Sequence, residues 1–310
     1  MVAWLRGPSP RRETKGATNM ARTRRIKFKD RDAFHHVTSR IAGRRMLLAD
    51  PRVKREMLDV LERAAEFSGV KVGAFAIMDN HFHVVLQVPA DAGTVPEAEV
   101  LRRYAALMGA KASLRLESRL RNLRAKGDSL AADGEIARLR ARMNDLSQFV
   151  KTFKEEFGRR FRKLHPYEGT IWEGRFKSTL VGEAEYLRYC SAYVELNPVR
   201  AGQSTMAEGY AWNTIGAAKR GSAFAKRCRE WLLSVLGHAC GDSPLDERSL
   251  KGRIAQISCG TLFGSAAFVS EMLGVFSEKV RSRSARARKV KGLGYASHGW
   301  VLAARLEKAA

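Results

Sequence analysis

The clearest hydrophobic pattern lies between residues 70 and 88, where two apolar, β-prone runs flank a short polar break. Residues 70–78 form the first run and residues 82–88 form the second. Asp79 and Asn80 stand between the runs, and residues of these types favour a tight turn. The pattern therefore predicts a β-hairpin in the middle of a sheet.

Two histidines stand where the second run begins. His81 and His83 are two residues apart, and side chains alternate along a strand, so both imidazoles point the same way while Phe82 packs on the other side. Two neighbouring imidazoles on a rigid strand supply half of a divalent-metal site. The alternative is an ordinary strand end that carries two polar residues on its solvent face.

Further strands and helices surround the hairpin. Residues 34–40 predict a first strand, and residues 51–67 predict a helix with an apolar stripe, opened by an Asp-Pro pair. Residues 146–161 predict a second helix and residues 171–181 a last strand. This order predicts an α+β fold that is ferredoxin-like or RRM-like, with an antiparallel sheet and helices on one face.

The segment of residues 96–145 is longer than the connection that a ferredoxin-like fold requires, and it is rich in arginine, leucine and alanine. Leucines recur near helical spacing and glycines interrupt them, so we expect a helical insertion of two or three amphipathic helices. Three roles stay open for this insertion: gripping DNA, mediating dimerisation, or forming a solvated arm.

A further helix is predicted over residues 183–197, with an acidic first turn and Pro198 as its end. Tyr193 and Asn197 are four residues apart and share one helix face. An amide oxygen that completes a His-His-Asn metal site, beside a phenol that attacks a phosphodiester, has a clear chemical use.

A free tyrosine has a pKa near ~10, so this phenol needs help to act at neutral pH. The alternative is that Tyr186, Tyr189 and Tyr193 form an aromatic core stripe along the helix.

The net charge of the chain indicates the kind of partner that it binds. A formal net charge of +24 over 310 residues exceeds what solubility requires and indicates a polyanionic partner, with nucleic acid first. Ribosomes and anionic lipid are the other candidates. The 4 cysteines show no paired spacing, which argues against a zinc module or a disulfide framework.

No apolar run reaches the length of a membrane span, and the first residues lack the apolar region of a signal peptide. We therefore expect a cytoplasmic, nucleoid-associated protein without a membrane partner. Residues 1–20 predict a disordered basic extension, with Met20 as a natural start. Residues 203–278 predict an accessory helical region, and residues 279–310 predict a basic C-terminal tail that stays mobile without a partner.

Five short segments carry a resemblance to a known family. They are residues 34–40 (Phe-His-His-Val-Thr-Ser-Arg), 78–83 (Met-Asp-Asn-His-Phe-His), 146–149 (Leu-Ser-Gln-Phe), 169–178 (Gly-Thr-Ile-Trp-Glu-Gly-Arg-Phe-Lys-Ser) and 193–202 (Tyr-Val-Glu-Leu-Asn-Pro-Val-Arg-Ala-Gly). In this order they resemble the single-tyrosine HUH transposases, and more narrowly the REP-associated tyrosine transposase (RAYT) branch. The resemblance covers roughly residues 21–202, which we take as the transposase domain.

The resemblance implies roles for four residues. His81 and His83 would bind the divalent metal, Mg²⁺ or Mn²⁺, and Asn197 would be its third ligand. Tyr193 would be the catalytic nucleophile, with Tyr189 as the rival on spacing alone. The implied partner is single-stranded or hairpin DNA, of the kind found in repetitive extragenic palindromes, bound by a monomer or a homodimer.

Basic residues near these segments are candidates for DNA contact, although charged residues on helices and hairpins are often only solvated. The candidates are Arg159, Arg160, Arg175, Lys177, Arg200, Arg286 and Arg288. Phe157 and Phe161 lie among the first of them, where they either flank a nucleic-acid backbone or pack in the core.

The sequence thus predicts an enzyme: a metal-dependent transposase and single-strand endonuclease that forms a 5′-phosphotyrosine intermediate. One alternative is a non-catalytic nucleic-acid-binding protein that uses exposed aromatic residues on its sheet. Another is a metallonuclease in which the metal activates water and no covalent intermediate forms. No Walker loop or glycine-rich dinucleotide turn is present, so nucleotide hydrolysis is not indicated.

Overall fold

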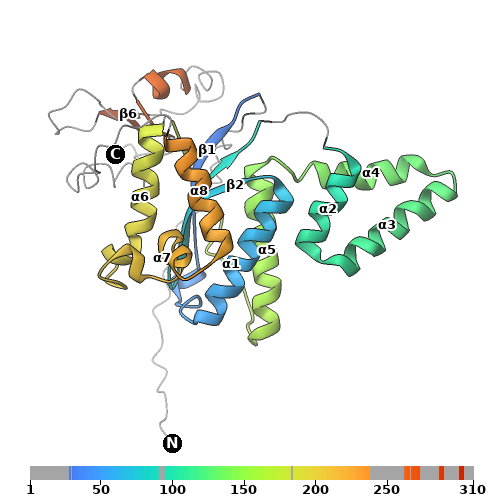
Figure 1. The fold of residues 1–310 in the computed structure, drawn as a ribbon, viewed down its shortest axis with the longest axis horizontal. Coiled ribbons are helices and arrows are strands. Elements are labelled where there is room, and N and C mark those ends of the chain that lie inside the picture. Colours follow the sequence, from blue (N-terminus) through green and yellow to red (C-terminus); the bar gives the residue numbers. More distant parts are fainter. Residues whose placement is uncertain are drawn as a thin grey trace, which may run out of the picture.

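The computed structural model describes residues 28, 30–90, 95–182, 184–237, 262–265, 267–272, 286–289 and 300–303. Their fold is α+β, built on a five-stranded sheet that helices flank (Figure 1). The strands are β1 (Ala33–Arg40), β2 (Lys71–Ile77), β3 (His81–Val88), β4 (Lys177–Val181) and β5 (Leu262–Phe263).

The strand order is β2-β3-β1-β4-β5. The first four strands pair antiparallel in the order of a ferredoxin-like fold, which confirms the predicted core. The prediction of a wholly antiparallel sheet is wrong at one edge, because β5 pairs parallel to β4. A parallel partner requires a long connection, and the chain between α6 and β5 supplies it.

Helices cover both faces of the sheet rather than one. Helices α1 (Pro51–Ser68) and α5 (Leu146–Leu164) pack on the face that carries Phe82 and Val84. Helices α6 (Ala184–Arg200) and α8 (Ala223–Gly237) lie over the opposite face (Figure 1). The prediction of helices on one face is wrong because β2 is apolar at every position after Lys71, and nearly all residues of β2 and β3 are buried, as in strands that are covered on both sides.

The first helix begins and ends where the sequence predicts. Asp50 caps α1 by accepting a hydrogen bond from the Arg52 amide at 2.8 Å. Gly69 ends α1 with a left-handed φ of 74°, which glycine adopts without strain.

Helix α6 does not end before Pro198, as predicted, but continues to Arg200. Proline removes only the one hydrogen bond that its own amide would donate. The Ala201 amide still donates to the Asn197 carbonyl at 3.0 Å, which closes the last turn. Position 197 therefore stays helical, one turn beyond Tyr193.

The predicted helical insertion consists of α2 (Glu97–Met108), α3 (Ala110–Ala125) and α4 (Ser129–Arg140). These helices share a small core that includes Val100, Leu120 and Ile136, and they project from the α1 side of the molecule (Figure 1). The presence of helices is thus confirmed, while the role of this arm stays a prediction.

Downstream of α6, the short elements η2 (Ala207–Gly209) and α7 (Thr214–Lys219) tie the chain back to the core. Asn213 donates to the carbonyl oxygens of Glu195 at 3.1 Å and Ala207 at 2.8 Å, and its own oxygen caps α7. The Phe75 amide of β2 donates to the Thr214 hydroxyl at 2.7 Å. These bonds fix α6 relative to the sheet.

The C-terminal residues that the structure describes form a two-stranded ribbon of β6 (Arg286–Lys289) and β7 (Trp300–Ala303). Arg286 and Arg288 thus lie on a paired strand, whereas a tail without structure of its own was expected. The extension predicted over residues 1–20 lies outside the described residues. None of the described helices is long and apolar enough to span a bilayer.

Gly216 offers a test of the α7 anchor. A Cβ at this position would lie 1.9 Å from the Tyr210 carbonyl oxygen. We expect Gly216→Ala to lower the free energy of unfolding by about 2 kcal/mol or more, because backbone must move to relieve the overlap. Urea unfolding followed by circular dichroism measures this change.

Gly134→Ala in α4 is the matched control, since nothing lies within 4 Å of a Cβ there. It should raise the free energy of unfolding by roughly 0.5–1 kcal/mol, because alanine favours a helix interior over glycine. Equal effects of the two substitutions would contradict the described packing of α7.

Candidate active site

Three histidines gather on the sheet face that α6 covers. His36 of β1 and His83 of β3 are buried, and their rings stack with centroids 5.2 Å apart. His36 Nε2 and His83 Nδ1 lie 2.9 Å apart and share a hydrogen bond. In the strand register His83 pairs with Thr38 and His36 with Val85, so the two histidines are diagonal neighbours.

His36 was not among the predicted site residues. A signal for it exists, because His35 and His36 are consecutive and must point to opposite faces of β1. One of them therefore had to share the face of His81 and His83. Only the strand order and register decide that it is His36, while His35 lies buried on the α5 side.

His81 lies nearer to solvent at the start of β3. Its ring centroid is 5.0 Å from that of His83, with the ring planes at 77°. His81 Nδ1 lies 2.7 Å from Asn80 Oδ1, while the amide nitrogen of Asn80 donates to the Arg44 carbonyl. With Oδ1 as acceptor, His81 carries its proton on Nδ1, which leaves the Nε2 lone pair available to a metal.

The ring of Tyr193 on α6 contacts two of these histidines. Its ring lies edge-on to His36 at 5.7 Å and to His83 at 5.6 Å between centroids. Tyr186 instead packs against Phe263 at 4.9 Å. Tyr193 and the histidines thus share one buried layer between β3 and α6.

Asn197 is buried one turn beyond Tyr193. Its amide nitrogen donates to the Tyr193 carbonyl at 2.8 Å, so its oxygen is the atom left for another partner. Gln203, further along the chain, donates to Asp79 in the β2–β3 turn at 2.6 Å. The chain after Tyr193 therefore runs toward the start of β3, and Asn197 lies along this path.

Arg200 completes the cluster at the end of α6. Its guanidinium carbon lies 5.2 Å from the centroid of the Tyr193 ring. A cation in this position is attracted to the ring face and stabilises negative charge on the phenol oxygen. Arg200 was predicted to contact DNA, and the structure adds this contact with Tyr193.

The surroundings hold both metal-binding candidates neutral at pH 7. Burial lowers the pKa of His81 to about 4, with a further contribution from the charge of Arg40 and an opposing one from Asp79. Burial also lowers the pKa of His83 well below its usual value, assisted by His36 and His81. A neutral imidazole is the form that binds a metal ion.

The Tyr193 phenol is also neutral at pH 7. Burial raises its pKa above the ordinary value for tyrosine, while Arg200 and Asn197 act in the opposite direction. Attack by this oxygen therefore requires further positive charge near it.

The donor atoms suit a mixed nitrogen and oxygen site. Among the described residues no group of three His, Cys, Asp or Glu side chains is arranged to hold a metal ion. The third ligand that the sequence predicts is the amide oxygen of Asn197. Two imidazoles and an amide oxygen suit Mn²⁺ better than Mg²⁺, which prefers an all-oxygen shell. If a metal binds His83 Nε2, the proton of His83 stays on Nδ1, and this N–H donates the hydrogen bond to His36 Nε2.

The predicted DNA contacts fall into two groups. Arg159 is paired with Glu156, and Arg160 is held by Glu56 and Asp59 of α1, so both charges already have carboxylate partners. Arg175 and Lys177 are exposed, like Arg159, but they form no ion pair among the described residues.

The phenylalanines of α5 are core residues. Phe157 and Phe161 are only 1% and 5% exposed, so neither ring is available to a nucleic acid. The interpretation of these rings as core residues is therefore confirmed.

Comparison with known proteins adds one finding. No protein-family model matches the sequence, and no curated protein matches it. Among solved structures, the chain is similar to a REP-associated tyrosine transposase bound to a REP hairpin, with a TM-score of 0.41 and 13% sequence identity. The match covers 65% of this chain and 87% of that chain.

Arg200→Met tests the electrostatics of the cluster. Removing the guanidinium should raise the pKa of the Tyr193 phenol further, because a positive charge that favours the phenolate is lost. The tyrosine Cζ resonances, followed by ¹³C NMR against pH in metal-free protein, report this shift, and Tyr193→Phe assigns the signal.

Arg227→Met serves as the control, since Arg227 of α8 pairs with Glu62 of α1. It should leave the Tyr193 titration unchanged. A Tyr193 pKa that does not rise in Arg200→Met would show that Arg200 does not act on the phenol.

Proposed function

We propose that this protein is a metal-dependent transposase and single-strand DNA endonuclease in which Tyr193 is the nucleophile. The observation that carries the proposal is the contact of the Tyr193 ring with His36 and His83, with Arg200 over the ring. A buried phenol, neutral imidazoles and a guanidinium in one layer match the needs of phosphodiester chemistry. The motif resemblance supports the same assignment.

The residues of the site have distinct roles in this proposal. His81, His83 and the Asn197 amide oxygen would hold Mn²⁺ or Mg²⁺. When bound, the ion would supply positive charge that neutralises and polarises the scissile phosphate. His36 fixes the orientation of the His83 ring and keeps the His83 proton on Nδ1, because the two side chains share a hydrogen bond. Arg200 favours the phenolate form of Tyr193.

The proposed reaction is a transesterification. The Tyr193 oxygen attacks phosphorus, the bond from phosphorus to the 3′ oxygen breaks, and a 5′-phosphotyrosine forms. The phenol gives up its proton, and the leaving oxygen becomes a 3′-hydroxyl. Attack by a different 3′-hydroxyl reverses the step and joins strands without a nucleotide cofactor, because the phosphotyrosine conserves the bond energy.

The proposed substrate is single-stranded DNA beside a hairpin, as the motif resemblance implies, of the palindromic REP type. The net charge of +24 suits such a polyanion. A folded hairpin offers shape and phosphate positions that basic residues read without contact to base edges.

The sheet itself argues against the non-catalytic alternative. A nucleic-acid-binding module of the RRM type stacks bases on aromatic residues of an open sheet face. Here α6 and α8 cover that face, and Phe34 on it packs toward Trp231 of α8. The layer between the sheet and α6 contains buried histidines and Tyr193 instead of exposed aromatic residues that could stack on bases.

Covalent capture tests the proposed nucleophile. Wild-type protein, incubated with Mn²⁺ and labelled hairpin-flanked single-stranded DNA from beside its own gene, should give a protein–DNA adduct on a denaturing gel. Tyr193→Phe should abolish the adduct because the attacking oxygen is gone, and EDTA should abolish it in wild type.

Tyr189→Phe is the matched control and should retain the adduct. An adduct that persists in Tyr193→Phe would move the nucleophile elsewhere. Cleavage without any adduct would indicate hydrolysis by activated water instead.

His36→Leu tests the support of the metal-binding histidine. Losing the partner of His83 Nδ1 should weaken Mn²⁺ binding by roughly 10–100-fold, the usual cost of removing a second-shell partner. Electron paramagnetic resonance of free Mn²⁺ during a titration measures the affinity.

His35→Leu is a close control, because His35 is a buried histidine of the same strand that faces away from the site. It should leave the affinity for Mn²⁺ unchanged. Equal losses in both variants would argue against a specific role for His36.

A further inference from the structure

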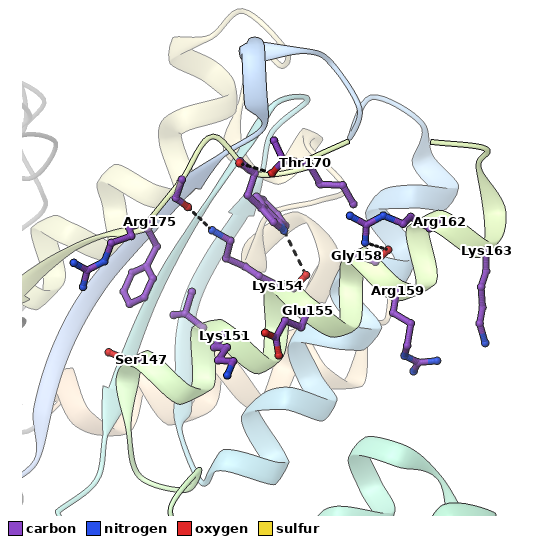
Figure 2. A pocket seen from close by; sticks show the side chains of 15 residues that line it. Ser147, Lys151, Lys154, Glu155, Gly158, Arg159, Arg162, Lys163, Thr170 and Arg175 are labelled. Carbon is purple, nitrogen blue, oxygen red and sulfur yellow. Dashed lines mark hydrogen bonds between the residues drawn. The ribbon is translucent and has the colours of Figure 1, made fainter. Parts of the chain in front are cut away.

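A basic groove lies on the side of the sheet away from Tyr193. It runs between the outer face of α5 and the segment of residues 170–176, with a volume of about 940 Å³ (Figure 2). Lys151, Lys154, Glu155, Arg159 and Arg162 recur at helical spacing along one wall. Arg175 stands at one end of the opposite wall.

Several cations of the groove have no carboxylate partner. Lys151, Arg162, Lys163 and Arg175 form no ion pair among the described residues, and the one carboxylate in the lining is Glu155. On the helical arm, by contrast, carboxylates already hold many guanidinium groups. Those arginines are Arg102, Arg103, Arg119, Arg124 and Arg138. Unpaired cations concentrated in a concave surface favour an anionic ligand.

Two aromatic residues line the groove, Trp172 and Phe176, and both pack against the core. Lys154 Nζ lies 4.9 Å from the Trp172 ring centroid, and the indole nitrogen donates to the Lys154 carbonyl at 3.3 Å. The indole also packs against the rings of Phe82 and Phe157. Because the core holds both rings in place, the groove suits phosphates rather than stacked bases.

The length of the charged wall fits a nucleic-acid strand. Lys163 lies twelve positions after Lys151, which corresponds to about 18 Å along α5. At a rise of about 3.4 Å for each phosphate of one strand, this wall faces roughly five phosphates.

One end of the groove lies near the candidate active site. Lys177 of β4 pairs with Thr38 of β1, which pairs in turn with His83 of β3. Two strand spacings place Lys177 about 10 Å from His83 along the sheet. Arg175, two residues earlier, belongs to the groove, so a strand that leaves His83 must pass Lys177 and turn round the β4 edge of the sheet to reach it.

We propose that this groove binds the phosphate backbone of the DNA strand that flanks the cleavage point, without preference for base sequence. The continuity with the scissile phosphate rests on the proposed function. The affinity of the groove for a DNA strand does not, so the two can be tested separately.

The test measures binding of fluorescein-labelled oligothymidylate by anisotropy, in EDTA and over a series of salt concentrations. The groove variant is Lys151→Gln/Lys163→Gln/Arg175→Gln. The matched control is Lys111→Gln/Arg115→Gln/Lys126→Gln, which removes the same charge from exposed residues in and just after α3.

The groove variant should lose roughly 10–100-fold in affinity, and its slope of log affinity against log salt should fall by about 2, since three phosphate contacts to a single strand are lost. The control should change affinity much less. The variant Lys151→Arg/Lys163→Arg/Arg175→Lys keeps the charge and should bind as wild type does, and thermal melting shows that each variant folds.

Equal losses in the groove variant and the α3 control would overturn the proposal, as would wild-type affinity in the groove variant. Metal-free binding is independent of cleavage. A failed covalent capture with a selective loss in the groove variant would therefore remove the proposed reaction and leave the groove as a DNA site.

Discussion

The structure depends on one constraint: β2 is apolar on both faces, so both faces of the sheet must be covered at this strand. A strand such as β2, with side chains like Val72, Phe75 and Ile77 on one side and Ala74 and Ala76 on the other, cannot leave either side in water without cost. The small alanines of the second face allow α6 to approach closely. The need to bury that face therefore brings Tyr193 against the histidines of β1 and β3.

Burial sets the chemistry of the site as well as its geometry. The same removal of water that lowers the pKa of His83 raises that of Tyr193, because in each case the charged form is disfavoured. The cluster is consequently neutral apart from Arg200, which lies exposed at its rim. Such a neutral site can bind a metal cation and a phosphate together, because the opposite charges of the two ligands neutralise each other in the site.

The sequence predicted local features well where a few residues decide the outcome. The β2–β3 hairpin turns at Asp79 and Asn80, and α1 begins after Asp50 and ends at Gly69, as expected from turn and cap chemistry. Long-range features were harder, because His36 joins the site only through the register of β1 with β3. Pro198 misled the prediction of the end of α6, since a single lost hydrogen bond does not outweigh the packing of a buried turn.

The contacts of the chain after α6 decide how short a fragment can be and still keep the site intact. Ala217, Ala225 and Cys228 belong to the core on the α1 side, and Leu232 packs against the core on the α6 side. Asn213 bonds to α6 and Thr214 to β2. A chain truncated at residue 202, where the sequence motifs end, would therefore strip both cores and loosen Tyr193, so the smallest unit able to carry this site extends through α8.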